Sequence, residues 1–320
     1  MSTTRRHGDA ALPFDAVLMV AFGGPTQPEE VRPFLAHVLQ GVPIPPERLE
    51  EVARHYDALG GRSPIAERTF QKAERLAALL QREGPQLPVH VGMRCWRPFI
   101  AEAVAHMRQD GIRRAVGLIM APHDSGAASW DRSVQAVTTA LDNSGPGAPA
   151  VEFAPPCFDH PDFIAAMAEL VRAQLLPIPH AQRHRTPLIF TAHSIPAAIA
   201  ASCPYVQQLE TSCRLVAETL GHPCWSLAYQ SRSGSPRERW LEPDIGNVLR
   251  ALHAEGHRSV VVVPIGFVTD NVEICYDLDV EAKRLADALG IEFRRADPAN
   301  DHPLYIRALA DLVRRQVAQG

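Results

Sequence analysis

Short apolar runs alternate along this chain with longer segments of helical periodicity. The runs cover residues 14–22, 89–93, 115–120 and 151–154 in the first half, and 188–193, 224–230, 259–267 and 291–296 in the second. Val260 to Val263 is β-branched throughout, which is typical of a strand buried on both faces. Because strands separated by helices predict βαβ units, we expect an α/β fold with parallel sheets.

The two halves of the chain resemble each other. Trp96 to Ile100 (WRPFI) is similar to Trp240 to Ile245 (WLEPDI). Such an internal duplication predicts two related Rossmann-like domains that face one another across a cleft. We expect an N-terminal domain over 14–176 and a C-terminal domain over 186–320 that includes a closing helix, with the Pro-rich, basic segment between them as the linker.

Composition narrows the class of protein. The formal net charge is −4 with both signs mixed, so no nucleic-acid partner is expected. The longest apolar runs fall short of the ~18 residues that a spanning helix needs, which predicts no integral membrane association. The first fifteen residues contain no apolar run, so no export signal is expected. The six cysteines lack a C-x-x-C pair, which suits reduced thiols in the cytoplasm.

A row of carboxylates follows the most apolar strand. Asp270 comes first, and Glu273, Asp277 and Glu281 then follow at intervals of four residues. If the chain is helical from Val272 onward, the last three share one face. A solvated acidic helix face is the alternative interpretation. The row begins at the carboxyl end of a strand, where ligand crevices of α/β sheets lie, and this favours a site that handles cations or protons.

Two histidines occupy comparable positions at strand ends. His193 ends the run LIFTAH, and His123 follows the third strand of the first half within MAPHDS. A neutral imidazole that faces the carboxylate row from a strand end is able to bind a transition metal or accept a proton. A purely structural role is the alternative for each.

Several segments together resemble one enzyme family. They are VAFGGP, YDALGGRSPI, VGMRCWRPFI, MAPHDS, TAHSIP, LAYQSRSGSPRERWLEPD, VVPIGFVTDNVEICYDLD and NDHPLYIRAL. The chain is similar to the ferrochelatases, which insert Fe²⁺ into a porphyrin, over residues 18 to 312. The resemblance implies two Rossmann-like domains around a porphyrin cleft, in agreement with the internal duplication.

The resemblance also implies roles for individual residues. His193 and Glu273 are expected to be the catalytic pair that binds the iron and handles the pyrrole protons. An acidic relay is expected at Asp277 and Glu281. Porphyrin contacts are expected at Phe22, His55, Tyr56, Ser63, His123 and Phe158.

The form of two segments bears on the substrate. MAPHDS and GGRSP are similar to the forms found in bacterial members that act on coproporphyrin III. We therefore expect a monomeric enzyme of haem biosynthesis whose partners are ferrous iron and coproporphyrin III and whose product is Fe-coproporphyrin. The chain also lacks the apolar lip or anchor expected of an enzyme that collects protoporphyrin from a membrane.

The chain departs from the family pattern in four places. Leu39, Gln40 and His55 stand in the region where other members place arginines that hold propionates, and Arg54 and Arg62 are the candidates to replace them. Asn271 stands where many members carry His, and Phe22 stands where some carry a Tyr that ligates iron. Some relatives bind an iron–sulfur cluster through cysteines beyond the last helix, whereas this chain ends RRQVAQG. No iron–sulfur cofactor is therefore expected.

Other functions remain open at this point. The substrate of a ferrochelatase is alternatively protoporphyrin IX. A cobalt or nickel tetrapyrrole chelatase is another candidate, since nitrogen and oxygen ligands do not by themselves select iron. A haem carrier is a third, although a carrier would not need the acidic row.

Overall fold

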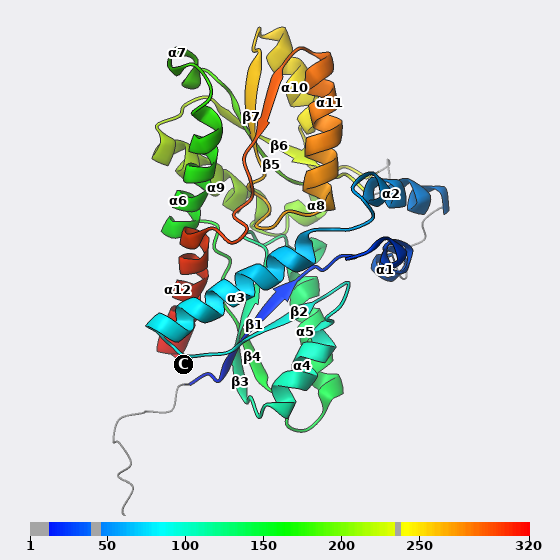
Figure 1. Cartoon of the computed structure of the whole chain (residues 1–320), viewed down its shortest axis with the longest axis vertical. Helices are drawn as coiled ribbons and strands as arrows, with labels where there is room; N and C mark the ends of the chain where they lie inside the picture. The colour runs from blue at the N-terminus through cyan, green and yellow to red at the C-terminus, as the bar shows by residue number, and fades with distance from the viewer. Residues whose placement is uncertain (1–12, 40–45, 234–237) are drawn as a thin grey trace, which may run out of the picture.

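The computed structural model describes residues 13–39, 46–233 and 238–320, and it contains two separate four-stranded sheets (Figure 1). The first sheet comprises β1 (Ala16–Ala21), β2 (Val89–Met93), β3 (Arg114–Ile119) and β4 (Ala150–Phe153), and the second comprises β5 (Leu188–His193), β6 (Trp225–Gln230), β7 (Ser259–Val263) and β8 (Glu292–Arg295). The strand orders are β2-β1-β3-β4 and β6-β5-β7-β8, and every pairing is parallel. The predicted α/β fold with two related parallel sheets is confirmed.

Helices cover both faces of the sheets. They are η1 (Pro28–Glu30), α1 (Val31–Val38), α2 (Pro46–Ala58), α3 (Ile65–Glu83), α4 (Ile100–Gln109), η2 (Gly126–Ala128), α5 (Trp130–Ser144), α6 (Pro161–Leu175), α7 (His180–Arg183), α8 (Ala197–Ala200), α9 (Tyr205–Leu220), α10 (Ile245–Ala254), η3 (Glu273–Ala282), α11 (Lys283–Ala288) and α12 (Pro303–Gln319). All six residues of β1 are buried, whereas the edge strands β4 and β8 are partly exposed. The central strands thus read as unbroken apolar runs because helices cover them on two sides.

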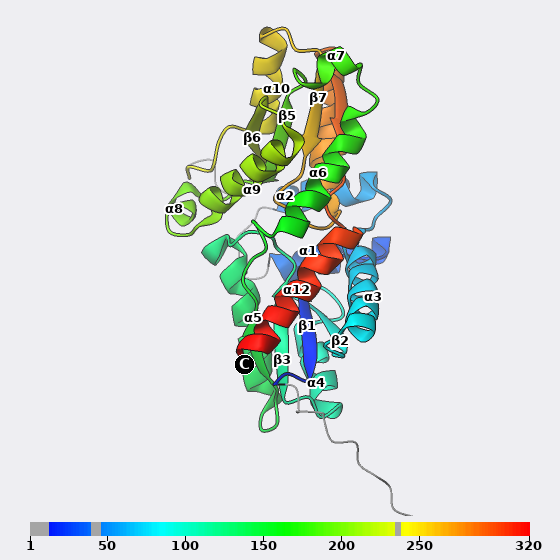
Figure 2. The same ribbon diagram turned by 90° about the vertical axis from the view of Figure 1, so that its left-hand side faces the viewer.

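Two long helices each pack on the half of the molecule to which they do not belong in sequence (Figure 2). The C-terminal helix α12 packs on α6 and on α3 and β3 of the first sheet, while α6 packs on α9 and β7 of the second. One hydrophobic core accordingly contains Val17 and Leu118 of the first sheet, Val261 and Val263 of the second, and Tyr305 of α12. The closing helix that was expected within the C-terminal domain therefore packs on elements of the first half, because an amphipathic helix covers whichever apolar face is open to it.

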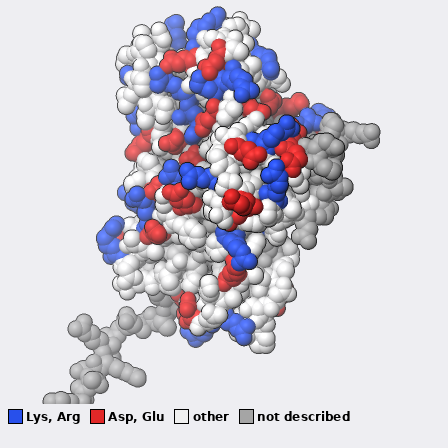
Figure 3. All heavy atoms as spheres, turned by 45° about the vertical axis from the view of Figure 1, so that its right-hand side comes forward, with Lys and Arg blue, Asp and Glu red and all other residues white. Residues whose placement is uncertain are grey.

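The distribution of surface charge and the apolarity of the helices are both ordinary in the part of the chain that the structure describes. On the face drawn in Figure 3, acidic and basic side chains are interspersed. No helix among the described residues has both the length and the apolarity to cross a membrane. The prediction that the chain has no export signal concerns its first fifteen residues. Most of these lie outside the described residues.

The carboxyl ends of the two sheets meet at the junction of the halves. His123, which follows β3, forms a hydrogen bond with Ser212 on α9 of the second half. Val268, which follows β7, accepts a hydrogen bond from Lys72 on α3 of the first half. Residues at the strand ends of both sheets are thereby brought into one region. In open α/β sheets, ligands bind in a crevice at these carboxyl ends.

Candidate active site

His193 and Glu273 lie opposite each other at the carboxyl end of the strands of the second sheet. His193 is the last residue of β5, and Glu273 begins η3. The imidazole Nε2 is 3.4 Å from Oε1 of the carboxylate. The side chains retain 29% and 45% of their exposure respectively, so both are open to a molecule that enters this region.

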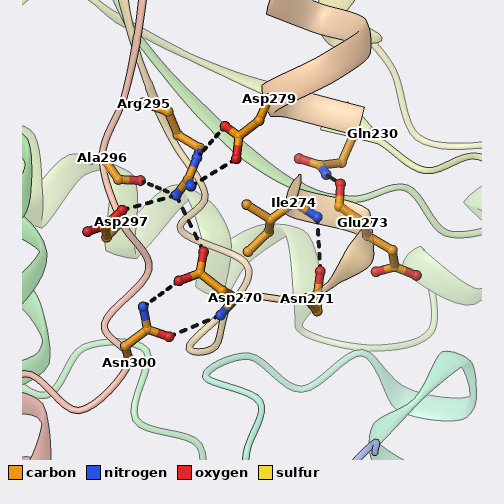
Figure 4. Close-up of polar contacts among 10 residues, drawn as sticks. All are labelled: Gln230, Asp270, Asn271, Glu273, Ile274, Asp279, Arg295, Ala296, Asp297 and Asn300. Atoms are coloured by element: carbon orange, nitrogen blue, oxygen red, sulfur yellow. Dashed lines mark hydrogen bonds and ion pairs between the residues drawn. The ribbon is translucent and has the colours of Figure 1, made fainter. Parts of the chain in front are cut away.

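Backbone contacts hold this pair in place. His193 Nδ1–H donates to the carbonyl of Ser194, which leaves Nε2 directed at Glu273. The Tyr205 hydroxyl donates to the His193 carbonyl over 3.1 Å. Gln230, which pairs with His193 across β5 and β6, donates from Nε2 to the Glu273 carbonyl over 2.9 Å (Figure 4). Hydrogen bonds from neighbouring residues thus set the geometry of the His193–Glu273 pair.

The two side chains shift each other's protonation. Burial alone lowers the pKa of His193, but the negative charges of Glu273 and Asp277 outweigh this and raise the pKa to about 9. Burial raises the pKa of Glu273, and the adjacent imidazolium lowers it by more, so it lies below its usual value. At neutral pH the pair is therefore an imidazolium and a carboxylate.

The carboxylates of η3 continue from this pair. The helix is π rather than α over Glu273–Ala282, a form that often occurs at functional sites. Burial and the charges of Glu273 and Glu281 together raise the pKa of Asp277 to about 7. The Ser231 hydroxyl donates a hydrogen bond to Asp277 and opposes that shift. Glu281 is exposed to solvent. The row therefore runs from the histidine to the surface.

Asp270, the first acid of the predicted run, lies apart from the row. Its amide donates to Asn300 Oδ1 over 3.0 Å, and Asn300 Nδ2 donates to its carboxylate over 2.7 Å. Arg295 lies 3.5 Å from the same carboxylate and forms two hydrogen bonds with Asp279 (Figure 4). Asp270 therefore anchors the segment before η3.

Aromatic side chains of the first half form a wall beside β1. The Phe34 ring lies 6.4 Å from Phe22, 5.8 Å from Tyr56 and 5.9 Å from Trp96, measured between centroids. Phe22 remains 39% exposed, and the Arg94 guanidinium lies 5.0 Å from its ring centroid. An exposed aromatic ring beside a cation suits contact with a flat, anionic ligand.

Helix α2 brings this wall to η3. The His55 ring stacks on Tyr276 of η3 with centroids 3.8 Å apart and an angle of 10° between the planes. Burial and the negative charge of Glu273 both raise the pKa of Tyr56. The structure thus brings His55 and Tyr56 into the same region as the histidine–carboxylate pair.

Three other predicted porphyrin contacts lie in less open places. Ser63 is 7% exposed, and its amide donates to the Pro25 carbonyl in the turn after β1. His123 is 2% exposed, and burial lowers its pKa to about 3, so the ring is neutral. The Ser212 hydroxyl contacts His123 Nε2 and donates to the carbonyl of Phe158. His123 thus faces the junction with α9 rather than an open cleft, because α9 packs over this strand end.

Sequence reasoning missed the residues that support the pair. Gln230 ends β6, the strand beside β5, and Ser231 follows it directly. This position was the available signal because neighbouring parallel strands end at the same sheet edge. Ser231 has φ 62°, an uncommon conformation for a residue other than glycine. Lys72 gave no local signal, since its partners lie almost two hundred residues away.

The described part of the chain holds no group of three or more His, Cys, Asp or Glu suited to cage a metal ion.

Comparison with known proteins points to one family. The family model described as ferrochelatase matches residues 14–317. A coproporphyrin III ferrochelatase of Mycobacterium leprae is 42% identical over 303 residues, which cover 94% of this chain and 88% of the relative. A ferrochelatase of Rhodopirellula baltica is 40% identical over 310 residues, which cover 96% and 87%.

Solved structures show the same fold at much lower identity. SirB from Bacillus subtilis with Fe³⁺ has a TM-score of 0.60 at 12% identity, over 96% of each chain. CbiX, the terminal enzyme for the biosynthesis of sirohaem in denitrifying bacteria, has a TM-score of 0.53 at 15% identity, over 94% of this chain and 98% of that one. At these identities the likeness concerns the two-domain fold alone.

Proposed function

The chain belongs to the ferrochelatase family, and we propose that it inserts Fe²⁺ into coproporphyrin III to give Fe-coproporphyrin in haem biosynthesis. The mycobacterial relatives that carry this name support the choice of porphyrin. The observation that carries the proposal is the exposed His193–Glu273 pair, which lies near an aromatic wall supplied by the other half of the molecule.

The residues of the pair divide the chemistry between them. Metal insertion releases two pyrrole protons and replaces them with one Fe²⁺ ion. His193 Nε2, once unprotonated, accepts a pyrrole proton, while its Nδ1–H stays bound to the Ser194 carbonyl. The Glu273 carboxylate offsets the positive charge of the incoming iron and of the protonated imidazole.

The row on η3 gives the released protons a route. In the empty site His193 is protonated, so it must lose that proton before it serves as a base. Asp277 is suited to exchange protons near neutral pH because its pKa is about 7. We propose that protons pass from His193 by way of Glu273 and Asp277 to the exposed Glu281.

The carboxylates of the porphyrin need donors at the rim of the site. Coproporphyrin III carries four propionates, and protoporphyrin IX carries two. We propose that Arg54 and Arg62, both exposed, and Arg94 beside Phe22 bind propionates. The aromatic wall of Phe22 and Phe34 would contact the macrocycle face.

A comparison of the insertion kinetics of the two porphyrins tests the choice of substrate. Purified protein is incubated anaerobically with Fe²⁺ and either porphyrin, with protoporphyrin IX kept monomeric in detergent, and insertion is followed by absorbance. We expect kcat/KM to be at least tenfold higher for coproporphyrin III. Equal or higher kcat/KM for protoporphyrin IX would contradict the proposed substrate. Faster insertion of Co²⁺ or Ni²⁺ would favour a different chelatase.

Three further properties belong to the same proposal. We propose that the protein acts as a monomer in the cytoplasm and without an iron–sulfur cluster. Its six cysteines are dispersed along the chain, which makes a cluster site unfavourable. Stoichiometric acid-labile sulfide in anaerobically purified protein would contradict the last point, and a sedimentation coefficient above that of a monomer would contradict the first.

A further inference from the structure

The chain uses lysine almost nowhere. Of its 32 Lys and Arg residues, only Lys72 and Lys283 are lysines. The Lys283 side chain is 43% exposed and pairs with Asp287 one turn away. Lys72 is fully buried, at 0% exposure. Burial of an ammonium group is costly unless hydrogen bonds compensate for lost water, so the position of Lys72 calls for a specific set of acceptors.

Those acceptors lie in the segment that leads to Glu273. Lys72 Nζ donates to the Val268 carbonyl over 2.9 Å and to the Thr269 hydroxyl. Both acceptors lie between β7 and η3, whereas Lys72 lies on α3 beside the first sheet. The Tyr305 ring of α12 lies 5.9 Å from the same nitrogen. One side chain therefore ties the first half of the molecule to the segment before η3.

The same segment is held from its other side. Asn300 bonds to both the amide and the carboxylate of Asp270, and Arg295 lies 3.5 Å from that carboxylate (Figure 4). Three consecutive residues, 268 to 270, are thus fixed by side chains from distant parts of the chain. Glu273 follows three residues later.

We propose that Lys72 is a positioning residue for metal insertion, which holds residues 268–270 against α3 and thereby sets Glu273 opposite His193. This inference rests on the proposed function. Burial lowers the pKa of Lys72 to about 7, and the charges of Asp270 and Asp301 partly oppose this. The hydrogen bonds to Val268 and Thr269 are available to the amine in either protonation state.

Lys72→Met separates positioning from packing. Methionine has similar length, so it keeps the space filled while it removes every donor to the Val268 carbonyl and the Thr269 hydroxyl. We expect kcat to fall about tenfold and KM for the porphyrin to stay within about twofold, with only a modest fall in the melting temperature. Lys283→Met is the matched control, and we expect unchanged kcat, KM and melting temperature.

A second variant keeps the test valid if Lys72→Met does not fold. Thr269→Val preserves shape and removes one acceptor, so we expect a kcat loss of about threefold and faster amide exchange in a peptide that covers residues 268–276. Where both variants fold, their effects on kcat should combine to less than the product of the single losses, because they remove the same interaction.

The exchange measurement makes the two proposals separately testable. Wild-type protein without insertion activity would overturn the proposed function. Wild-type kcat in Lys72→Met, or unchanged exchange over residues 268–276 in both variants, would overturn the role of Lys72 alone. A parallel loss of kcat and melting temperature with slow exchange retained would also overturn it.

Discussion

The two sheets share one topology but end in different chemistry. Strand orders β2-β1-β3-β4 and β6-β5-β7-β8 correspond strand for strand. Just beyond the end of β1 stands Phe22, 39% exposed, whereas the equivalent strand β5 ends in His193. In the first half the strand end is flanked by Arg94 and aromatic rings, and in the second by Gln230 and Glu273.

This difference shows how a duplicated fold divides its work. The interiors of β1 and β5 are both buried and mainly apolar because the same helix-covered environment constrains them. Residues at the carboxyl ends are released from that constraint, so they are where two copies of one fold diverge in chemistry. We infer that the first half mainly contacts the macrocycle and that the second half mainly performs the reaction.

The substitution His193→Ala should have the largest effect and tests whether the second half performs the reaction. We expect kcat for metal insertion to fall about a thousandfold, because the proton acceptor is lost. Affinity for the free porphyrin should change by less than about tenfold, since binding rests on the other half. Stopped-flow insertion assays and fluorescence titration measure the two quantities. Retained turnover in a folded variant would refute the catalytic role.

Substitutions along η3 should show a graded effect. Glu273→Gln is expected to lower kcat about a hundredfold, because it removes the charge that faces His193. Asp277→Asn and Glu281→Gln should each cost about tenfold, or ~1.4 kcal/mol in the barrier, since they lie farther from the reacting nitrogens. Steady-state kinetics at saturating porphyrin measure this order. Equally mild effects at all three positions would show that the row is only a solvated helix face.

The first half should respond in a different kinetic parameter. We expect Phe22→Ala to raise KM for the porphyrin about tenfold and to leave kcat within about twofold, because the ring contacts the macrocycle and not the protons. A conservative Phe22→Leu change should have a smaller effect. A kcat loss comparable to that of Glu273→Gln would contradict the division between the halves.

The smallest expected effect is the dependence of the unfolding free energy on pH. The pKa of His193 is about 9 in the folded protein and 6.5 ordinarily, so its ion pair stabilises the fold fully below pH 6.5 and loses this effect as pH rises through 9. The lowered pKa of Glu273 makes the same contribution fade as pH falls below its ordinary 4.5. Because both side chains are partly exposed, the amplitude should be about 1 kcal/mol or less.

Urea unfolding at pH 5.5, 7.5 and 9.5 measures this effect. The difference in unfolding free energy between wild type and Glu273→Gln should be largest at pH 5.5 and smallest at pH 9.5. The corresponding difference for Phe22→Ala should be independent of pH, because Phe22 carries no titrating group. A wild-type advantage over Glu273→Gln that grows from pH 5.5 to 9.5 would contradict the raised pKa of His193.

Local pattern determined much of this protein. The eight strands, their parallel pairing and the place of His193 at a strand end follow from apolar runs and from the residues that terminate them. The spacing of Glu273, Asp277 and Glu281 placed three acids on one helix. These features depend on neighbours within a few residues, so periodicity reveals them.

Only the tertiary structure decided which distant groups meet. It packed α12 on the first half, buried His123 against α9, made η3 a π-helix and buried Lys72 beneath Val268. The apolar face of α12 fits either half equally well as a pattern, and the signal for Lys72 is an ordinary polar position on a helix. The positions of α12, His123 and Lys72 depend on packing between segments more than fifty residues apart. The energy of desolvation and the available acceptors decide that packing, and local periodicity reveals neither.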